Sequence, residues 1–417
     1  MTDLTSFKET EIGPIPVDWE VVRLGEVAAL TMGQSPPSST YNTDGAGLPF
    51  LQGKAEFGET YPTPVKWCSR PQKVADRGSV LLSVRAPVGD ANVARDDYCI
   101  GRGLAAINGS ESLDNWFLFY VLILAKRRLE EMGTGSTFKS INRGVLQNFS
   151  IPLPSLREQR RIARVLSTIQ RAIAAQDDLI AAAREVKRSL MQRLFTYGPS
   201  PEPAPMKETE IGEVPEHWAV VQLGDALQTT QYGLSVRADR TGTYPMLRMN
   251  NLEDGYIDAS DLKYVDLDER DFAKFRVYKR DVLFNRTNSY ELVGKTAIFD
   301  IEGDFVFASY LIRVVPNAAQ LLPECLNYYL NWDDAQRRLK MLATRGVSQS
   351  NTSATKLKQF AIGLPSLVEQ AEIARTLSVA DRKIEAEEQR KAALQALFKA
   401  MLHQLMTGQI RVKDMEL

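Results

Sequence analysis

An internal repeat organises this chain of 417 residues. The segment KETEIGPIPVDWEVVRLGE at 8–26 aligns without a gap on KETEIGEVPEHWAVVQLGD at 207–225, and 12 of the 19 positions are identical. A second pair, IPLPSLREQRRIARVLS from Ile151 and IGLPSLVEQAEIARTLS from Ile362, follows in the same order. Because repeated segments build repeated structural units, the sequence predicts two related halves with pseudo-two-fold symmetry.

Each half consists of a lead segment, a dissimilar middle and a shared tail. The middles share a plan of short β-branched and aromatic strands, which we expect at 48–52 and 78–82 in the first half and at 244–248 and 280–284 in the second. A helix is expected after them, at 115–132 and at 323–342. The predicted domains are 1–150, a central helical segment 151–198, a second domain 199–361, and a distal helical segment with the tail, 362–417.

The tails predict two long helices. Ser155 and Glu158, like Ser366 and Glu369, form S-x-x-E capping boxes after a proline, and 38 residues without Gly or Pro follow in each copy. Apolar residues repeat with 4-3 spacing, which is typical of a helix that needs a partner helix. They are Ile162, Leu166, Ile169, Ile173, Ile180, Leu190 and Leu194 in the first helix, and Ile373, Leu377, Ala380, Ile384, Leu394, Phe398, Met401 and Leu405 in the second. Either the two helices pair antiparallel, or each packs on its own domain.

Polar residues interrupt both rows. Gln176 and Lys187 in the first helix, and Glu387 and Lys391 in the second, either fix the register of the pair or lie exposed where the apolar row ends.

The composition excludes several classes of protein. Three cysteines without a CxxC pair, Cys68, Cys99 and Cys325, form no disulfide framework or thiolate zinc site. The N-terminus does not have the pattern of a signal peptide, and no apolar run approaches 18 residues, so we expect a cytoplasmic protein with no membrane contact. The net charge of −1 hides acidic lead segments and mildly basic bodies that could meet phosphate.

Motifs of catalysis are incomplete. Gly294-Lys295-Thr296 ends like a phosphate loop but lacks its first glycine, and Gly101-Arg102-Gly103 is a lone GxG. The two histidines, His217 and His403, have no ligand-like neighbours. We therefore expect no catalytic site and no metal site in this chain. Trp19 and Trp218 are expected in the core.

The whole arrangement resembles the specificity subunits of type I restriction-modification systems. The likeness is carried by the paired W-x-V-V-x-L-G segments, GQSPPSSTYN at 33–42, LLSVRAPVGD at 81–90, GSTFKSINRGVLQNFSIPLPSLREQ at 135–159 and GVSQSNTSATKLKQFAIGLPSLVEQ at 346–370. The second half lacks the SPP and SVRAP pieces, so contact residues transfer to it less directly.

The resemblance implies an α+β fold, in which two pseudo-two-fold-related α/β target recognition domains are separated by an antiparallel coiled coil of two long helices. Each domain would read one half of a split double-stranded DNA site, and the helices would set the gap between the halves. It also implies docking of two modification (methyltransferase) subunits, which hold S-adenosylmethionine, and of restriction (motor/nuclease) subunits. The chain itself would carry no cofactor and would be non-catalytic.

Base edges are read by side chains that form two hydrogen bonds, chiefly Arg, Asn and Gln, whereas most Lys and Arg contacts go to phosphate. Each candidate taken singly could instead be a solvated or turn-stabilising residue. In the first half the candidate DNA contacts are Gln34, Ser35, Gln52, Lys54, Arg85, Lys139, Ser140 and Arg143. In the second half they are Tyr232, Arg248, Asn250, Asn251, Arg286, Asn288, Arg345, Ser348, Gln349 and Asn351.

Two other functions stay open from the sequence. The chain could be a coiled-coil scaffold that binds proteins and has only non-specific DNA affinity, or an enzyme with an unrecognised nuclease or methylase fold. A scaffold predicts binding without sequence preference, and an enzyme predicts activity of the purified chain alone.

Overall fold

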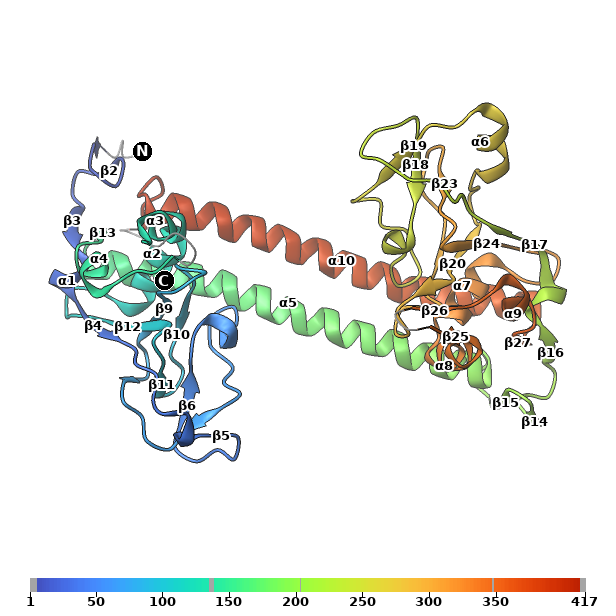
Figure 1. Cartoon of the computed structure of the whole chain (residues 1–417), viewed down its shortest axis with the longest axis horizontal. Helices are drawn as coiled ribbons and strands as arrows, with labels where there is room; N and C mark the ends of the chain where they lie inside the picture. The colour runs from blue at the N-terminus through green and yellow to red at the C-terminus, as the bar shows by residue number, and fades with distance from the viewer. Residues whose placement is uncertain (1–5, 135–138, 203, 347–348, 413–417) are drawn as a thin grey trace. The chain divides into compact units, whose positions relative to one another are not determined.

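The computed structural model describes residues 6–134, 139–202, 204–346 and 349–412. The chain divides into two compact units, Met1–Asp177 with Gln389–Leu417, and Asp178–Glu388 (Figure 1). The two long helices, α5 (Leu156–Tyr197) and α10 (Leu367–Met406), each contribute residues to both units. The domain boundaries expected from the sequence, which set the helices apart as segments of their own, stay a prediction.

The first unit is built on a four-stranded antiparallel sheet. The strand order is β10-β9-β12-β4, with β10 (Ala91–Val93), β9 (Val80–Ser83), β12 (Leu104–Gly109) and β4 (Ala28–Met32). Helix α2 (Asn115–Leu124) contacts β9, β10 and β12, and its Phe117 and Tyr120 join Leu82 and Ile107 in one buried core. The expected strand at 78–82 is confirmed as β9.

A second sheet of the first unit contains a parallel pair. Its order is β5-β7-β6-β11-β8, with β5 (Tyr41–Asn42), β7 (Trp67–Cys68), β6 (Leu48–Leu51), β11 (Tyr98–Ile100) and β8 (Val74–Ala75), and β6 and β11 run parallel. The lead and tail segments form the pairs β1 (Phe7–Lys8) with β2 (Ile15–Pro16) and β3 (Glu20–Arg23) with β13 (Ser150–Leu153). Short helices α1 (Leu24–Val27) and α4 (Arg143–Gln147) contact each other.

The second unit repeats this plan. Its main sheet has the order β17-β24-β20-β22, with β17 (Leu227–Tyr232), β24 (Leu311–Pro316), β20 (Val282–Asn285) and β22 (Thr296–Ile298), and α7 (Pro323–Asn331) contacts three of these strands. The parallel pair recurs as β18 (Tyr244–Leu247) with β23 (Val306–Phe307), beside β19 (Lys263–Val265). The lead and tail pairs recur as β14 (Met206–Thr209) with β15 (Gly212–Pro215) and β16 (Ala219–Gln222) with β27 (Ala361–Leu364). The predicted structural repeat is therefore confirmed at the level of strand order.

Both helices expected in the middles are broken in two. The first consists of α2 and α3 (Lys126–Met132), which join at Ala125, and the second of α7 and α8 (Asp333–Leu342), which join at Trp332. Trp332 has an extended backbone, with φ −67° and ψ 137°, because its indole turns into a cluster with Phe195 and Tyr329. Tertiary packing of one aromatic side chain thus ends a helix that the sequence pattern would continue.

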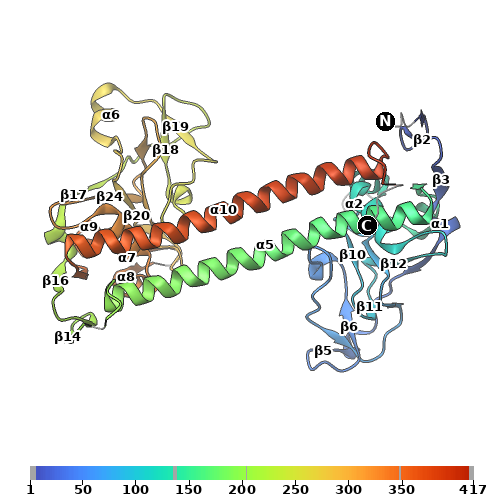
Figure 2. The same cartoon turned by 180° about the vertical axis from the view of Figure 1, so that it is seen from behind.

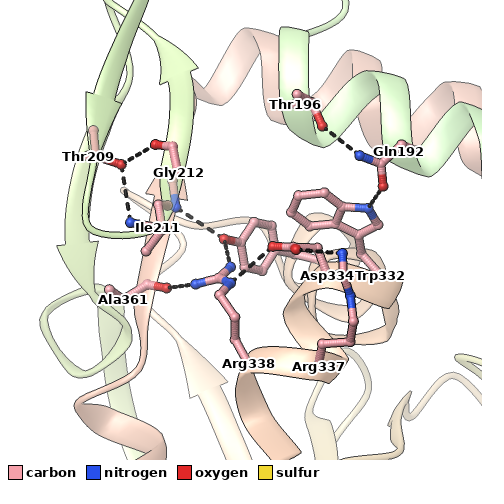
Figure 3. Close-up of polar contacts among 12 residues, drawn as sticks. Gln192, Thr196, Thr209, Ile211, Gly212, Trp332, Asp334, Arg337, Arg338 and Ala361 are labelled. Carbon is pink, nitrogen blue, oxygen red and sulfur yellow. Dashed lines mark hydrogen bonds and ion pairs between the residues drawn. The ribbon is translucent and has the colours of Figure 1, made fainter. Parts of the chain in front are cut away.

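Helix α8 is tied to its surroundings by polar contacts on two sides (Figure 3). The Trp332 indole N–H donates to Oε1 of Gln192 on α5 at 3.0 Å, and Gln192 in turn donates to Thr196 at 3.2 Å. On the other side, Arg338 donates to the carbonyl of Ala361 on β27 at 2.9 Å and pairs with Asp334 at 3.1 Å. These contacts join the tail strand, the helix of the middle and the end of α5 within the second unit.

The long helices begin and end as the sequence predicts. The Oγ atoms of Ser155 and Ser366 accept the backbone N–H groups of Glu158 and Glu369 at 3.4 and 3.3 Å. Gly198 and Gly408 follow the helix ends with φ of +81° and +71°, and each lies against a buried tryptophan, Trp218 or Trp19. The expected core positions of both tryptophans are confirmed, since each is 1% exposed.

The two long helices pair antiparallel within the first unit. Ile162 and Leu166 near the start of α5 share a core with Leu402 and Leu405 near the end of α10. Further along, Lys391 forms an ion pair with Asp177. Early residues of α5 therefore meet late residues of α10, which is the antiparallel arrangement (Figure 2).

The second unit contains the opposite ends of the same helices, also antiparallel. Leu194 and Phe195 of α5 share a core with Ile373 and Leu377 of α10. Lys187 pairs with Asp381 at 2.6 Å, and Arg184 pairs with Glu388 at 2.6 Å. The polar residues of the two apolar rows therefore lie within the helix pairs. Lys187 and Lys391 each form an ion pair with the other long helix. Gln176 and Glu387 are 3% and 6% exposed. Their burial favours the role in register over the alternative of an exposed seam end.

The segment after α10 returns to the lead segment of the first unit. The Arg411 guanidinium donates to both carboxylate oxygens of Glu158, at 2.7 and 2.9 Å, and to both of Asp18 at 2.9 Å. It also lies over the Trp19 ring, whose N–H donates to Glu158 at 3.2 Å. Desolvation disfavours the charged guanidinium, but these carboxylates raise the pKa of Arg411 above its ordinary value. In the second unit the matching Glu369 accepts from Trp218 and His217 instead.

Across the described parts of the chain, no helix is both long enough and apolar enough to cross a bilayer.

Candidate nucleic-acid interface

The main sheet of each unit brings three strand ends together. In the first unit β4 and β9 end where β12 begins, because Met32 is opposite Ala105 and Ser83 is opposite Leu104. In the second unit β17 and β20 end beside the start of β24, since Tyr232 and Phe284 are both opposite Ile312. We call the residues just beyond these ends the strand-end surface. It comprises 33–35, 84–85, 101–103 and 139–141 in the first unit, and 232–234, 286–288, 308–310 and 349–352 in the second.

Arg286 occupies the centre of the second strand-end surface. Its N–H donates to the carbonyl of Tyr310 at 3.0 Å, and its own carbonyl accepts from Thr352 at 2.8 Å. The guanidinium lies 4.8 Å from the centre of the Tyr232 ring and donates to Ser309 O at 3.3 Å and to Asn351 Oδ1 at 3.1 Å. Among the described residues, its Nε has no acceptor. The side chain is therefore held in one orientation.

Neighbouring candidates belong to the same network. Asn351 donates to the Thr287 hydroxyl at 2.7 Å, and the backbone of Asn288 pairs with Ser350. Tyr232 is 42% exposed, and its hydroxyl accepts the N–H of Ala354. The structure thus brings together Tyr232, Arg286, Asn288 and Asn351, which are far apart in the sequence.

The loop before α9 (Ala354–Lys358) forms the rim of this surface. Arg345 lies on β25 (Thr344–Arg345) opposite Ser350 of β26 (Ser350–Asn351), and exposed Gln349 accepts the N–H of Gly346 through its carbonyl at 2.8 Å. Ser348 lies outside the described residues.

Arg248, Asn250 and Asn251 form a second group, on the loop after β18. Arg248 donates to the carbonyl and the carboxylate of Asp261 at 2.9 and 3.0 Å, and exposed Asn250 donates to the same carboxylate at 3.3 Å. Asn251 is 1% exposed, and its amide donates to Asp258 O and Asp261 O at 2.9 Å. In the described conformation Asn251 therefore shapes the loop, and Asn250 presents the accessible amide.

In the first unit the strand-end surface carries different side chains on the same backbone. Gln34 is exposed and is fixed by its N–H, which donates to Ile100 O at 3.0 Å, while the Ser35 hydroxyl accepts from Arg102 N at 3.3 Å. Gln52 is exposed after β6, and its carbonyl accepts from Gly103 at 3.2 Å. These three residues meet at the start of β12.

Arg85 and Ser140 face each other across a β-bridge on this surface. Ile141 N donates to Val84 O at 2.9 Å, just as Thr352 N donates to Arg286 O in the other unit. By these matching hydrogen bonds Arg286 corresponds to Val84, and Thr287 corresponds to Arg85. Val84 is buried, at 2% exposed. Arg143, the first residue of α4, is exposed nearby.

Two predicted lysines of the first unit have partners within the protein. Lys54 pairs with Asp90 at 2.6 Å, and Lys126 pairs with the other oxygen of the same carboxylate at 2.6 Å. Although desolvation opposes ionisation, these two lysines lower the pKa of Asp90. Lys139 donates to Glu130 O at 3.1 Å and remains exposed. Lys54 thus has a structural role that sequence reasoning did not assign.

Comparison with known proteins identifies the family. The family model of the type I restriction modification DNA specificity domain matches the chain twice, over residues 16–183 and 215–396. The chain belongs to this family.

Relatives agree with this assignment. The chain is 51% identical over 188 residues to a putative type I restriction enzyme MjaX specificity subunit of Methanocaldococcus jannaschii, a match that covers 44% of this chain and 43% of that relative. It is 26% identical over 415 residues to the MjaVIII specificity subunit of the same organism, covering 98% of this chain and 97% of the relative. The crystal structure of a type I restriction-modification system S subunit from M. genitalium has the same fold, with a TM-score of 0.57 at 16% identity over 93% of this chain and 96% of that one.

Sequence reasoning missed two residues of these specificity domains. Arg102 is exposed in the turn before β12, and Tyr310 is 46% exposed in the matching turn before β24. Both lie on the strand-end surface through the contacts of Arg102 with Ser35 and of Tyr310 with Arg286. The sequence did contain a signal for the first: Gly101 and Gly103 flank Arg102, and an added Cβ at Gly103 would lie 2.6 Å from Gln52 O.

Proposed function

We propose that this chain reads a two-part DNA site, with one half-site at each strand-end surface. The observation that carries the proposal is that both units place the same backbone segments at the same end of the same sheet, while the side chains there differ. A shared scaffold with unlike readers suits an asymmetric site, because each half is recognised by its own set of donors and acceptors.

The exposed and half-buried side chains of these surfaces suit base recognition. Gln34, Arg85 and Gln52 in the first unit, and Arg286 and Asn351 in the second, can each form two hydrogen bonds to a base edge in the major groove. Lys139 and Arg143 suit phosphate, which receives most contacts in such interfaces. Arg286 is also pre-oriented by Tyr232, which lowers the entropic cost of binding.

We further propose that the paired long helices set the gap between the half-sites and help to dock two modification subunits. Helix α5 is continuous over 42 residues, and a helix of this length rises by about 63 Å at 1.5 Å per residue. Methylation would then be performed by the modification subunits with S-adenosylmethionine, restriction subunits would complete the assembly, and this chain would supply specificity without a catalytic group. The two relatives described above are both specificity subunits, which supports this division of labour.

The test is a domain exchange in the presence of the cognate modification subunit. Residues 27–150 are replaced by the matching segment of the MjaVIII specificity subunit, and methylated sites are mapped by sequencing modified bases. We expect one half of a two-part motif to change and the other half to stay. The reciprocal exchange of residues 226–361 is the matched control and should change only the other half. A change in both halves after either exchange contradicts the proposal.

Binding of the purified chain distinguishes the remaining alternatives. A specificity subunit should bind its site with an affinity that falls steeply as salt is added, because phosphate contacts release counterions. A protein-binding scaffold would show no sequence preference in a gel-shift assay, and an enzyme would cleave or methylate DNA without any partner.

A further inference from the structure

The two strand-end surfaces can be compared residue by residue, because equivalent backbone hydrogen bonds hold them. Val84 N donates to Gly103 O at 2.9 Å in the first unit. Arg286 N donates to Tyr310 O at 3.0 Å in the second. Together with the strand register and the bonds to Val84 O and Arg286 O described above, these contacts assign a counterpart to each position. The counterparts of Met32, Arg85, Arg102, Gly103 and Lys139 are, in this order, Tyr232, Thr287, Ser309, Tyr310 and Ser350.

The first surface is cationic and the second is nearly neutral. Arg85, Arg102 and Lys139 are all exposed, and the four segments of the first surface contain no acidic residue. Each of these cations has a neutral counterpart in the second unit. The four segments of the second surface contain one charged residue, Arg286, which is half-buried and donates to two oxygen atoms of the chain itself. Attraction of phosphate therefore contributes less at the second surface, where neutral contacts carry more of the recognition.

Two exposed tyrosine rings distinguish the second surface. Tyr310 is 46% exposed at the tip of a tight turn, in which Leu311 N donates to Ala308 O at 2.9 Å. Tyr232 is 42% exposed, and the Arg286 guanidinium lies 4.8 Å from the centre of its ring. Since Arg286 N also donates to Tyr310 O, both tyrosines border the same central residue. The second surface thus offers aromatic area at the strand ends where the first offers charge.

The Tyr310 ring has no counterpart in the first unit. The matching residue is Gly103, and a Cβ added there would lie 2.6 Å from the carbonyl oxygen of Gln52. In the first unit a backbone carbonyl therefore lies where the side chain of Tyr310 leaves the turn in the second. The difference is built into the backbone around the turn, so a single substitution at Gly103 would not transfer the ring.

The chemistry of a tyrosine ring limits what it can recognise on a duplex. In the major groove the base pairs present hydrogen-bond donors and acceptors and one apolar group, the 5-methyl group of thymine. A ring beside the base edges gains most from covering that methyl group, because the contact removes apolar surface from water. Resting on the proposed function, we propose that the half-site read by the second unit contains a thymine whose 5-methyl group packs against the Tyr310 ring.

Removal of the methyl group from the DNA tests this contact. 2′-Deoxyuridine keeps the base pair and the hydrogen-bonding groups of thymine and lacks only the methyl group. The full-length chain with its cognate modification subunit is titrated with duplexes in which each thymine of the mapped second half-site is replaced in turn. At one position we expect affinity to fall about fourfold, as loss of one buried methyl group does.

Variants of Tyr310 complete a double-mutant cycle. In Tyr310→Ala the same replacement should change affinity by less than about 1.5-fold, because the partner of the methyl group is gone. Tyr310→Phe should keep the fourfold effect, since the ring and not the hydroxyl makes the contact. The measured quantity is the ratio of two affinities of one variant, so a loss of folded protein does not change it. Arg102→Ala, in the matching turn of the first unit, is the control and should leave the ratio as in the wild type.

The outcomes separate this contact from the proposed function. A second half-site without thymine on either strand, or a ratio near one at every thymine, refutes the contact. The same ratio in wild type and in Tyr310→Ala also refutes it. In these cases the proposed function stands as long as base changes in the second half-site weaken binding. If such base changes leave binding unchanged, the proposed function fails and the thymine contact fails with it.

Crosslinking locates the methyl group directly. 5-Iodo-2′-deoxyuridine carries iodine in the place of the methyl group, and under ultraviolet light it bonds to an aromatic side chain in contact with it. With this base at the responsive position, we expect the crosslinked peptide to contain Tyr310 and the crosslink to disappear in Tyr310→Ala. A crosslink to a residue of the first unit, or one that persists unchanged in Tyr310→Ala, overturns the assignment.

Discussion

Removal of the Arg411 side chain should destabilise the first unit strongly. Arg411 is the cation that neutralises Glu158, whose side chain is 2% exposed, and the arginine side chain itself is 13% exposed. In Arg411→Ala the Glu158 carboxylate would stay buried, and among the described residues the Trp19 N–H would be its one remaining side-chain donor. Removing one partner of a buried pair costs about 3–5 kcal/mol, because the remaining charge is desolvated without compensation.

The expected change in melting temperature follows from the size of the unit. A domain of about 200 residues loses roughly 2–4 °C in Tm for each kcal/mol, so Arg411→Ala should lower the Tm of the first unit by roughly 10 °C. Thermal unfolding by differential scanning calorimetry measures this value. The double variant Glu158→Gln with Arg411→Leu removes both charges together and should recover at least half of the loss.

The second repeat supplies the control. His217 pairs with Glu369 at the matching position, but the side chains are 53% and 19% exposed, so His217→Ala should cost less than about 1 kcal/mol. If Arg411→Ala melts within 1 °C of the wild type, or if the two variants lose equal stability, then Arg411 does not hold the lead segment as described.

Three further predictions concern charge, recognition and spacing. Folding lowers the pKa of Asp90 below its unfolded value of 3.8, so the Asp90 carboxylate contributes its full stability above that pH and loses it as pH falls through the folded pKa. The difference in urea midpoint between wild type and Asp90→Asn should therefore shrink below about pH 4. A difference that grows there would contradict the assignment. Arg286→Lys removes the planar guanidinium group over the Tyr232 ring and should weaken binding to the cognate second half-site by about 1–3 kcal/mol. Arg85→Lys should weaken binding to the first half-site alone. Competition gel shifts with mutated half-sites measure both effects. Seven residues inserted into both long helices, after Asp178 and after Gln389, preserve the heptad spacing and lengthen each helix by about 10 Å. The gap in the methylated motif should then lengthen by about 3 base pairs. An unchanged gap would exclude the helices as the spacer.

The sequence alone predicted the parts of the fold that depend on local pattern. Capping residues and the 4-3 spacing of apolar residues were sufficient for α5 and α10, and short runs rich in β-branched and aromatic residues were sufficient for β9 and β20. The breaks at Ala125 and Trp332 were missed because neither residue is a helix breaker. The Trp332 break depends on contacts with Gln192 and Phe195, more than 130 residues away, which no local pattern reveals.

The candidate site was predicted by residue type better than by environment. The loop residues Gln34, Arg85 and Gln349 are exposed, as a DNA contact requires. The burial of Asn251 and the ion pair of Lys54 with Asp90 depend on contacts with residues distant in the sequence. The sequence around a polar residue next to a strand is the same whether its side chain is buried or exposed, so these environments could not be predicted. Whether the exposed residues contact DNA remains a prediction for the exchange and half-site experiments.

The division of the chain into units has a consequence for the order of events on the ribosome. The second unit consists of one uninterrupted stretch, 178–388, whereas the core of the first unit includes Leu402 and Leu405 from the end of α10. The domain that is synthesised first therefore lacks part of its interior until more than 200 further residues have been made, a wait of roughly 10–40 s at 5–20 residues per second. During that interval the core around Ile162 and Leu166 lacks Leu402 and Leu405, so part of its apolar surface is open to chaperones and to other nascent chains.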